Sequence, residues 1–186
     1  KQMGELLVEN STLRKKLSET ENLVESYNKL NPLTFDLLPA RVLGISRYLN
    51  IDRGSSDNLS VGEVVVYKDS YVGQIKSVGP KISQVLLSED PDSKIAVFSQ
   101  GNERRSRGIV TGQFGSELLM DKILHQETVE VGDLVYAEGT EGKLPKGLII
   151  GKIIQIFEQP NQVFKQAKVE PIFKITDLDT VFVIKN

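Results

Sequence analysis

Few residues in this chain of 186 residues are suited to acid–base or nucleophilic chemistry. His125 is the only histidine, and cysteine is absent, which excludes thiol catalysis, disulfides and cysteine-based metal sites. A serine nucleophile needs an imidazole base held by a carboxylate, and no Gly-x-Ser-x-Gly motif is present. The common zinc sites need several histidine or cysteine ligands. The sequence therefore predicts no catalytic residue, no metal site and no cofactor, and a protein that is not an enzyme.

Carboxylates and glycine-rich loops offer no better site. Glu89, Asp90 and Asp92 flank Pro91 in a segment that looks like a solvated turn. Glycoside hydrolysis would also need a sugar-binding cleft, which a chain without tryptophan supplies poorly. The glycines of segment 139–142 lack the spacing of a phosphate-binding loop. We therefore interpret both segments as turns.

The charge balance argues against a nucleic-acid partner. The chain has 23 basic and 25 acidic residues, with a formal net charge of −2, whereas nucleic-acid binders usually carry a basic face. Arg104, Arg105 and Arg107 form the only local basic excess, and Glu103 stands beside them. We expect this cluster to be a solvated loop.

No apolar run approaches the roughly 20 residues that a membrane-spanning helix needs. The chain starts at Lys1 and shows no charged-then-apolar leader. We expect it to be an excised fragment, with any membrane anchor lying upstream.

Residues 1–31 predict a coiled-coil dimerisation helix. They are rich in Glu, Leu, Lys and Arg, and Pro32 stops the helix. Positions spaced alternately by three and four form a seam that suits a partner helix. The predicted dimer interface consists of Met3, Leu6, Asn10, Leu13, Leu17, Thr20, Val24 and Tyr27.

Charges beside the seam favour a parallel homodimer. Glu9 and Lys16 occupy g positions and face Arg14 and Glu21 at the following e positions of the partner helix. Asn10, at an a position, is the polar residue that fixes register and two-strandedness at some cost in stability. The alternative is an amphipathic helix packed on its own domain, which requires a wider apolar stripe.

From residue 40 onward the hydrophobic period changes from 3.5 to 2, and short β-rich runs alternate with turn residues. Twelve short strands favour barrels or sandwiches over a βαβ sheet. Segment 121–130 is either a turn of helix or an irregular connection. The predicted strands are Arg41–Ile45, Tyr48–Asp52, Val64–Tyr67, Tyr71–Val78, Ile82–Leu87, Lys94–Phe98, Gly108–Thr111, Glu117–Met120, Leu134–Ala137, Leu148–Phe157, Phe164–Glu170 and Thr180–Ile184.

An internal echo divides the β region. The sequence VGEVV at 61–65 recurs as VGDLV at 131–135, and a glycine-led strand follows each. The echo indicates either two related small barrels or similar turn chemistry.

We therefore predict a mainly β fold with an N-terminal α-helix, in three parts. Residues 1–31 are the helix, and residues 32–92 form a first β-barrel, which residues 168–186 complete if the last strand returns to it. Residues 93–167 form a second β-barrel.

Several motifs carry a resemblance to a known family. They are Ile51-Asp52-Arg53-Gly54, Asp57-Asn58-Leu59-Ser60-Val61-Gly62, Arg107-Gly108-Ile109-Val110-Thr111-Gly112, Val131-Gly132-Asp133-Leu134-Val135 and Pro145-Lys146-Gly147-Leu148. In this order, over nearly the whole chain, they resemble the extracytoplasmic part of the rod-shape-determining protein MreC family. One departure is Ala137-Glu138-Gly139, where the family usually has Thr-Ser-Gly.

The resemblance implies a non-catalytic extracytoplasmic scaffold of the bacterial cell-elongation machinery. It implies two small six-stranded β-barrels, one chymotrypsin-like in arrangement, and a homodimer that can extend into filaments. The implied partners are a penicillin-binding transpeptidase, MreD, RodZ and the MreB-linked complex. The implied location is the cell membrane, as a single-pass protein anchored by an N-terminal helix absent from this sequence, with this fragment on the periplasmic side.

Two alternatives remain at this point. A periplasmic adaptor of an export system also joins a coiled coil to a β-barrel, but two helical runs should flank its lipoyl-like domain. A protease-like hydrolase would depend on His125 as its base. No sequence feature singles out the residues that bind a partner.

Overall fold

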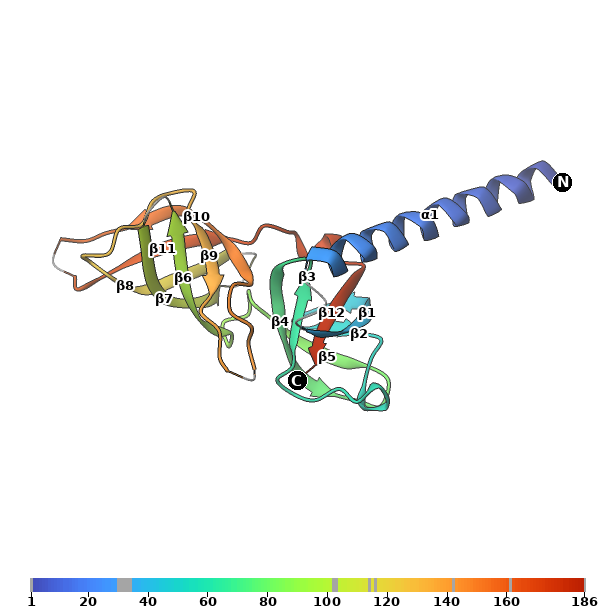
Figure 1. Cartoon of the computed structure of the whole chain (residues 1–186), viewed down its shortest axis with the longest axis horizontal. Helices are drawn as coiled ribbons and strands as arrows, with labels where there is room; N and C mark the ends of the chain where they lie inside the picture. The colour runs from blue at the N-terminus through green and yellow to red at the C-terminus, as the bar shows by residue number, and fades with distance from the viewer. Residues whose placement is uncertain are drawn as a thin grey trace.

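The computed structural model describes residues 2–29, 35–101, 104–113, 115, 117–141, 143–160 and 162–185. Within them, one helix, α1 (Gln2–Lys29), projects as a rod from an elongated β body (Figure 1). Two short 3-10 helices, η1 (Ser55–Asp57) and η2 (Ile175–Asp177), lie in connections. The strands are β1 (Asp36–Ile45), β2 (Leu49–Ile51), β3 (Val64–Tyr67), β4 (Ser70–Val78), β5 (Ser83–Leu87), β6 (Lys94–Gly101), β7 (Arg104–Gln113), β8 (Glu117–Leu124), β9 (Leu134–Ala137), β10 (Ile149–Phe157), β11 (Phe164–Glu170) and β12 (Thr180–Lys185).

Each predicted strand overlaps one of these, and the clearest differences lie at strand ends. Strand β1 begins at Asp36, five residues earlier than predicted, and runs through Pro39. Proline is tolerated there because β2 pairs with β1 only from Val42 onward, so that Pro39 has a strand on one side only. The undecided segment 121–130 is not helical, since it begins as the end of β8 and continues as a turn.

Six strands form a closed barrel. Their hydrogen-bonded order is β4-β3-β12-β1-β2-β5, and β5 pairs back with β4. The closing strand, β12, comes from the far end of the sequence and lies between β1 and β3. We call strands β1–β5 and β12 the first strand set.

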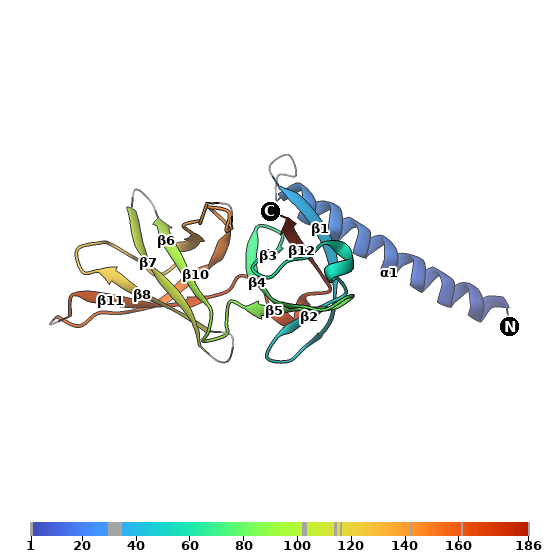
Figure 2. The ribbon, with the colours of Figure 1, turned by 90° about the horizontal axis from the view of Figure 1, so that it is seen from below.

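The other six strands, β6–β11, form the second strand set, which lies farther from the helix (Figure 2). Their order is β9-β6-β7-β8-β11-β10, and β10 also pairs with β9. The two closed orders match strand for strand. In this match β12, β1, β2, β3, β4 and β5 of the first set correspond, in that sequence, to β6, β7, β8, β9, β10 and β11 of the second. The two strand sets therefore share one pairing scheme, and in the first set its leading strand is supplied by the chain's last strand.

The sequence echo marks the same turn in both strand sets. Gly62 and Gly132 have φ of 92° and 98°, a conformation that favours glycine. The Gly62 N–H donates to the carbonyl of Ile75, thirteen residues later, at 2.8 Å. The Gly132 N–H donates to the carbonyl of Ile153, twenty-one residues later, also at 2.8 Å. The echo therefore reflects repeated structure as well as repeated sequence.

The acidic residue of each echo caps its own turn. Glu63 accepts a hydrogen bond at 3.0 Å from the backbone N–H of Ser60, three residues earlier. Asp133 accepts the equivalent bond from Glu130 at 2.9 Å. Both carboxylates are buried, so this hydrogen bond satisfies a charge that would otherwise be costly to bury.

The hydrophobic core lies on both faces of β3 and β12. Val65 and Val183 belong to the cluster inside the first strand set. Val64, Val66 and Phe182 point the other way and join the cluster that includes the interior of the second strand set. Strands buried on both faces read as continuous apolar runs, which explains the sequence VVV of residues 64–66.

We call β3 and β12, which are buried on both faces, the shared wall. Shortening a side chain on the face that points toward the second strand set should destabilise the whole β body. We expect Phe182→Ala to lower the free energy of unfolding by about 3–5 kcal/mol, because it opens a cavity between two apolar layers. Chemical denaturation followed by circular dichroism measures the change.

Phe157→Ala is the matched control, since Phe157 is 42% exposed. We expect it to cost less than about 1 kcal/mol. Equal losses in the two variants would contradict a shared wall.

Candidate functional site

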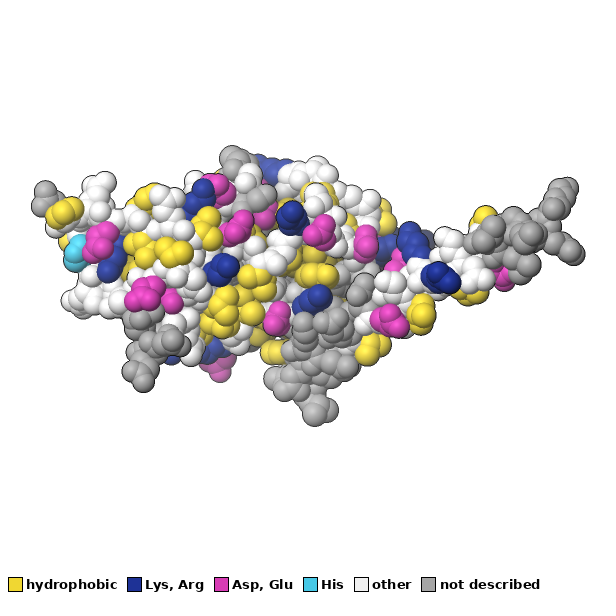
Figure 3. All heavy atoms as spheres, turned by 90° about the horizontal axis from the view of Figure 1, so that it is seen from above, with side chains coloured by type: hydrophobic (Ala, Val, Ile, Leu, Met, Phe, Trp, Pro, Cys, Tyr) yellow, Lys and Arg dark blue, Asp and Glu magenta, His cyan; other side chains and the backbone are white. Residues whose placement is uncertain are grey.

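The apolar seam of α1 is open to solvent along its described length. Leu13, Leu17 and Val24 are 57%, 60% and 54% exposed, and Asn10 and Thr20 are exposed as well. Hydrophobic side chains are visible along the rod in Figure 3. The other three predicted seam side chains, of Met3, Leu6 and Tyr27, lie outside the described side chains.

The described part of α1 therefore does not bury its stripe against the β strands, as a helix packed on its own domain would. Thr20 also suits a seam position despite its hydroxyl. The hydroxyl donates to the backbone carbonyl of Lys16 at 2.8 Å, so its hydrogen bond is made within the helix.

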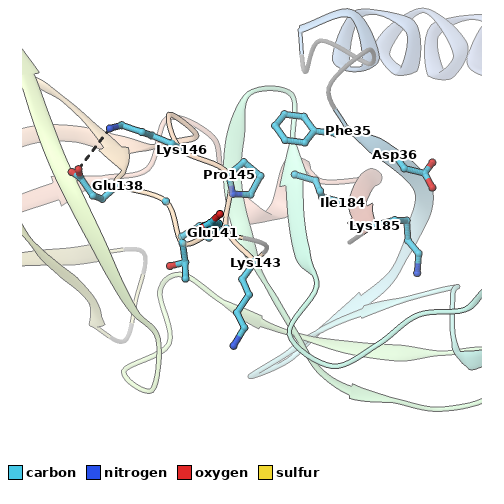
Figure 4. Close-up of a pocket in the computed structure, with 12 residues that line it drawn as sticks. Phe35, Asp36, Glu138, Glu141, Lys143, Pro145, Lys146, Ile184 and Lys185 are labelled. Carbon is cyan, nitrogen blue, oxygen red and sulfur yellow. Dashed lines mark ion pairs between the residues drawn. The ribbon is translucent and has the colours of Figure 1, made fainter.

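A cleft of about 450 Å³, the junction cleft, lies between the two strand sets (Figure 4). Phe35 and Asp36 line it at the start of β1, and Ile184 and Lys185 at the end of β12. The turn between β9 and β10, residues 138–141 and 143–146, forms the opposite side. The cleft was not foreseen, because it joins segments more than 100 residues apart.

The end of β12 is fastened beside this cleft. Lys185 Nζ lies 2.8 Å from Glu63 Oε1 and also donates to the carbonyl of Asn58. Glu63 thus joins two elements through its carboxylate, the capped turn before β3 and the last strand.

The prediction of a solvated turn at residues 89–92 is wrong for Asp90, which is 5% exposed. Arg47, in the β1–β2 turn, donates to the two Asp90 carboxylate oxygens at 2.7 and 3.1 Å and to Asp92 at 2.7 Å. These hydrogen bonds lower the pKa of Asp90 and raise the pKa of Arg47. Glu89 differs, because burial raises its pKa.

The remaining residues considered for chemistry lie apart from one another. His125 Nε2 lies 3.2 Å from Glu158 Oε1 near the far end of the second strand set, so its described partner is a carboxylate. Arg105 and Arg107 lie on β7, which begins four residues earlier than predicted, so the expectation of a loop is wrong for them.

Among the described residues, no helix is long and apolar enough to cross a membrane. No three histidine, cysteine or acidic side chains in that part of the chain are grouped so that they could hold a metal ion.

A solvent-exposed helix joined to a closed six-stranded β-barrel and further strands defines a helix-and-barrel protein. The family described as "Rod shape-determining protein MreC, barrel core" matches residues 42–185. The chain therefore belongs to the MreC family, as its sequence motifs predicted.

Known relatives agree with this assignment. The cell shape-determining protein MreC of Listeria monocytogenes is 25% identical over 176 residues, which cover 92% of this chain and 59% of the relative. The chain thus spans about three fifths of that relative's length. A solved structure of MreC matches with a TM-score of 0.81 at 22% identity, over 91% of this chain and 98% of the other.

A second structure is a complex between penicillin-binding protein PBP2 and MreC from Helicobacter pylori. It matches with a TM-score of 0.62 at 18% identity and covers 82% of this chain and 99% of the other. At this identity the likeness concerns the fold.

The Arg47–Asp90 pair should make stability depend on pH. Because the pKa of Asp90 is lowered in the folded protein, its stabilisation is present above the ordinary value of 3.8 and is lost as pH falls through the folded value. We expect Asp90→Asn to lower the melting temperature by several degrees at pH 7. The difference from wild type should shrink steadily below pH 4.

Asp179→Asn, at an exposed carboxylate in the β11–β12 connection, is the control for this measurement. We expect it to follow the wild-type pH profile. A deficit in Asp90→Asn that stays constant as the pH is lowered from 7 through 4 to 2 would show that its cause is not the charge.

Proposed function

We propose that this chain is the extracytoplasmic part of a non-catalytic scaffold that organises peptidoglycan synthesis enzymes and thereby maintains cell shape. The match of residues 42–185 to the MreC family carries this proposal. The relatives named cell shape-determining proteins support it further.

The two strand sets are two six-stranded β-barrels in this proposal. Their shared pairing scheme supports this proposal. Each set has six antiparallel strand pairings, which are compatible with a chymotrypsin-like arrangement. The first barrel comprises residues 32–92 and the C-terminal segment, and the second begins at residue 93. We set the second boundary after Glu170, slightly later than residue 167, because β11 pairs with β8 and β10.

The α1 seam joins two copies in parallel. Its exposed apolar side chains and the complementary g and e charges support this arrangement. Two joined copies present two β bodies at one place, which raises the local concentration of binding surfaces without new contacts. A membrane anchor upstream of the helix, with this chain on the periplasmic side, suits a rod whose N-terminus points away from the β body (Figure 1).

A penicillin-binding transpeptidase is the partner best supported, because the Helicobacter pylori neighbour is a complex with PBP2. MreD, RodZ, the MreB-linked machinery and filament formation remain expectations from the family. The export adaptor is disfavoured, because the family match covers most of the chain.

A charge in the seam should separate the two copies. We expect Leu17→Glu to raise the dimer dissociation constant at least about a hundredfold, because two unpaired carboxylates would be buried against apolar neighbours. Sedimentation equilibrium measures this constant.

Val8→Glu is the matched control. Val8 is 68% exposed on the same helix, at an f position that faces away from the predicted seam. We expect it to remain dimeric. In the bacterium that encodes the chain, the full-length protein with Leu17→Glu should fail to maintain rod shape, and the Val8→Glu protein should maintain it. A wild-type chain that is monomeric at high concentration would refute the dimer but not the family assignment.

Asn10 offers an independent test of the heptad register. We expect Asn10→Leu to raise the melting temperature of the dimer while allowing larger oligomers, because buried asparagine at an a position trades stability for specificity. Thermal melting and light scattering report the two effects. A lower melting temperature with strict dimerisation would place Asn10 outside the seam.

A further inference from the structure

Three cations converge on one carboxylate at the edge of the second strand set. Arg105 Nη2 lies 3.3 Å from Glu138 Oε1, Arg107 Nη2 lies 3.6 Å from it, and Lys146 Nζ lies 3.8 Å from it. We call these four side chains the Glu138 cluster. The fold brings them together from β7, the end of β9 and the turn before β10, although they lie up to 41 positions apart in the sequence.

An aromatic platform holds two of the cations in place. The Arg105 guanidinium lies 4.1 Å from the centroid of the Phe98 ring, and Lys146 Nζ lies 5.7 Å from the same centroid. Phe98 in turn stacks on Tyr136 of the neighbouring strand, with centroids 5.4 Å apart. Cation–π contacts of this kind restrain the positive groups before any ligand arrives.

Within the cluster three cations face one carboxylate, an excess of two positive charges. The Glu127 carboxylate nearby, which accepts a hydrogen bond from the Arg107 backbone N–H at 3.3 Å, reduces this excess. Arginine presents five N–H donors in a planar fork, and Arg105 directs its Nη2 at both Glu138 carboxylate oxygens, at 3.3 and 3.4 Å. All three cationic side chains are open to solvent, so an external ligand can reach the unused donors.

We propose that the Glu138 cluster is a binding site for a phosphate monoester. A phosphate monoester carries about −1.5 to −2 charges at pH 7 and three acceptor oxygens, which match the excess charge and the three donor groups. Arginine forks bind phosphate through paired hydrogen bonds, and lysine adds a point charge. Glu138 and Lys146 also line the junction cleft, which gives the organic part of the ligand a place to lie (Figure 4).

The test is a titration of the full chain with glycerol 3-phosphate, followed by isothermal titration calorimetry. We expect saturable binding that Arg105→Gln and Arg107→Gln each weaken about tenfold or more, since each removes a charge-assisted pair. Lys152→Gln removes the same charge from exposed β10 and should leave the affinity unchanged.

Glu138→Gln gives the more discriminating result. Glu138 competes with the ligand for the same donors, so its neutralisation should tighten binding several-fold. Glu117→Gln adds the same net charge at the Lys168 pair and should have no effect. Tightening by both variants alike, or no saturable heat up to about 10 mM ligand, would overturn the proposal.

Vesicles distinguish the source of the phosphate. Sedimentation with phosphatidic acid vesicles, but not with phosphatidylcholine vesicles, would identify a lipid headgroup, and binding of glycerol 3-phosphate alone would identify a soluble ligand. Equal binding of acetate and glycerol 3-phosphate would show an ordinary anion-exchange surface and refute a phosphate site. None of these outcomes depends on dimerisation.

Discussion

The central residues of β3 and β12 are buried on both faces, and this constraint determines how the rest of the chain is arranged. One face completes the interior of the first strand set, and the other supports the second strand set. A valine wall of this kind can exist only where apolar layers cover both its sides. Phe35 and Leu37, at the start of the β body, pack on the same core.

Much of this fold could be predicted because its signals are local. Short β-rich runs between turn residues located all twelve strands, and the heptad spacing located the helix. The echo of residues 61–65 at 131–135 was informative for the same reason, since a glycine with positive φ and an acid that caps its own turn act within a few residues. Strand ends were less accurate, as at Pro39, because a strand's limits depend on which neighbours pair with it.

The sites depend on contacts that no local pattern announces. Arg47 reaches Asp90 across 43 positions, and Arg105 reaches Glu138 across 33. The sequence showed the arginines near residue 105 as an isolated basic run, because it cannot show that Lys146 and Glu138 fold against them. The seam residues of α1 are the opposite case, since spacing alone selects them and the fold leaves those described exposed.

The position of β12 has a consequence for how the protein is made. Ribosomes deliver the N-terminal end first, so β1–β5 emerge long before the strand that closes their barrel. Until then β1 and β3 each lack a neighbour, and unpaired strand edges invite aggregation and proteolysis. A product cut short before Thr180 would lack the closing strand of the first barrel and the Phe182 and Ile184 side chains that pack on the second strand set, so proteolysis can remove incomplete chains.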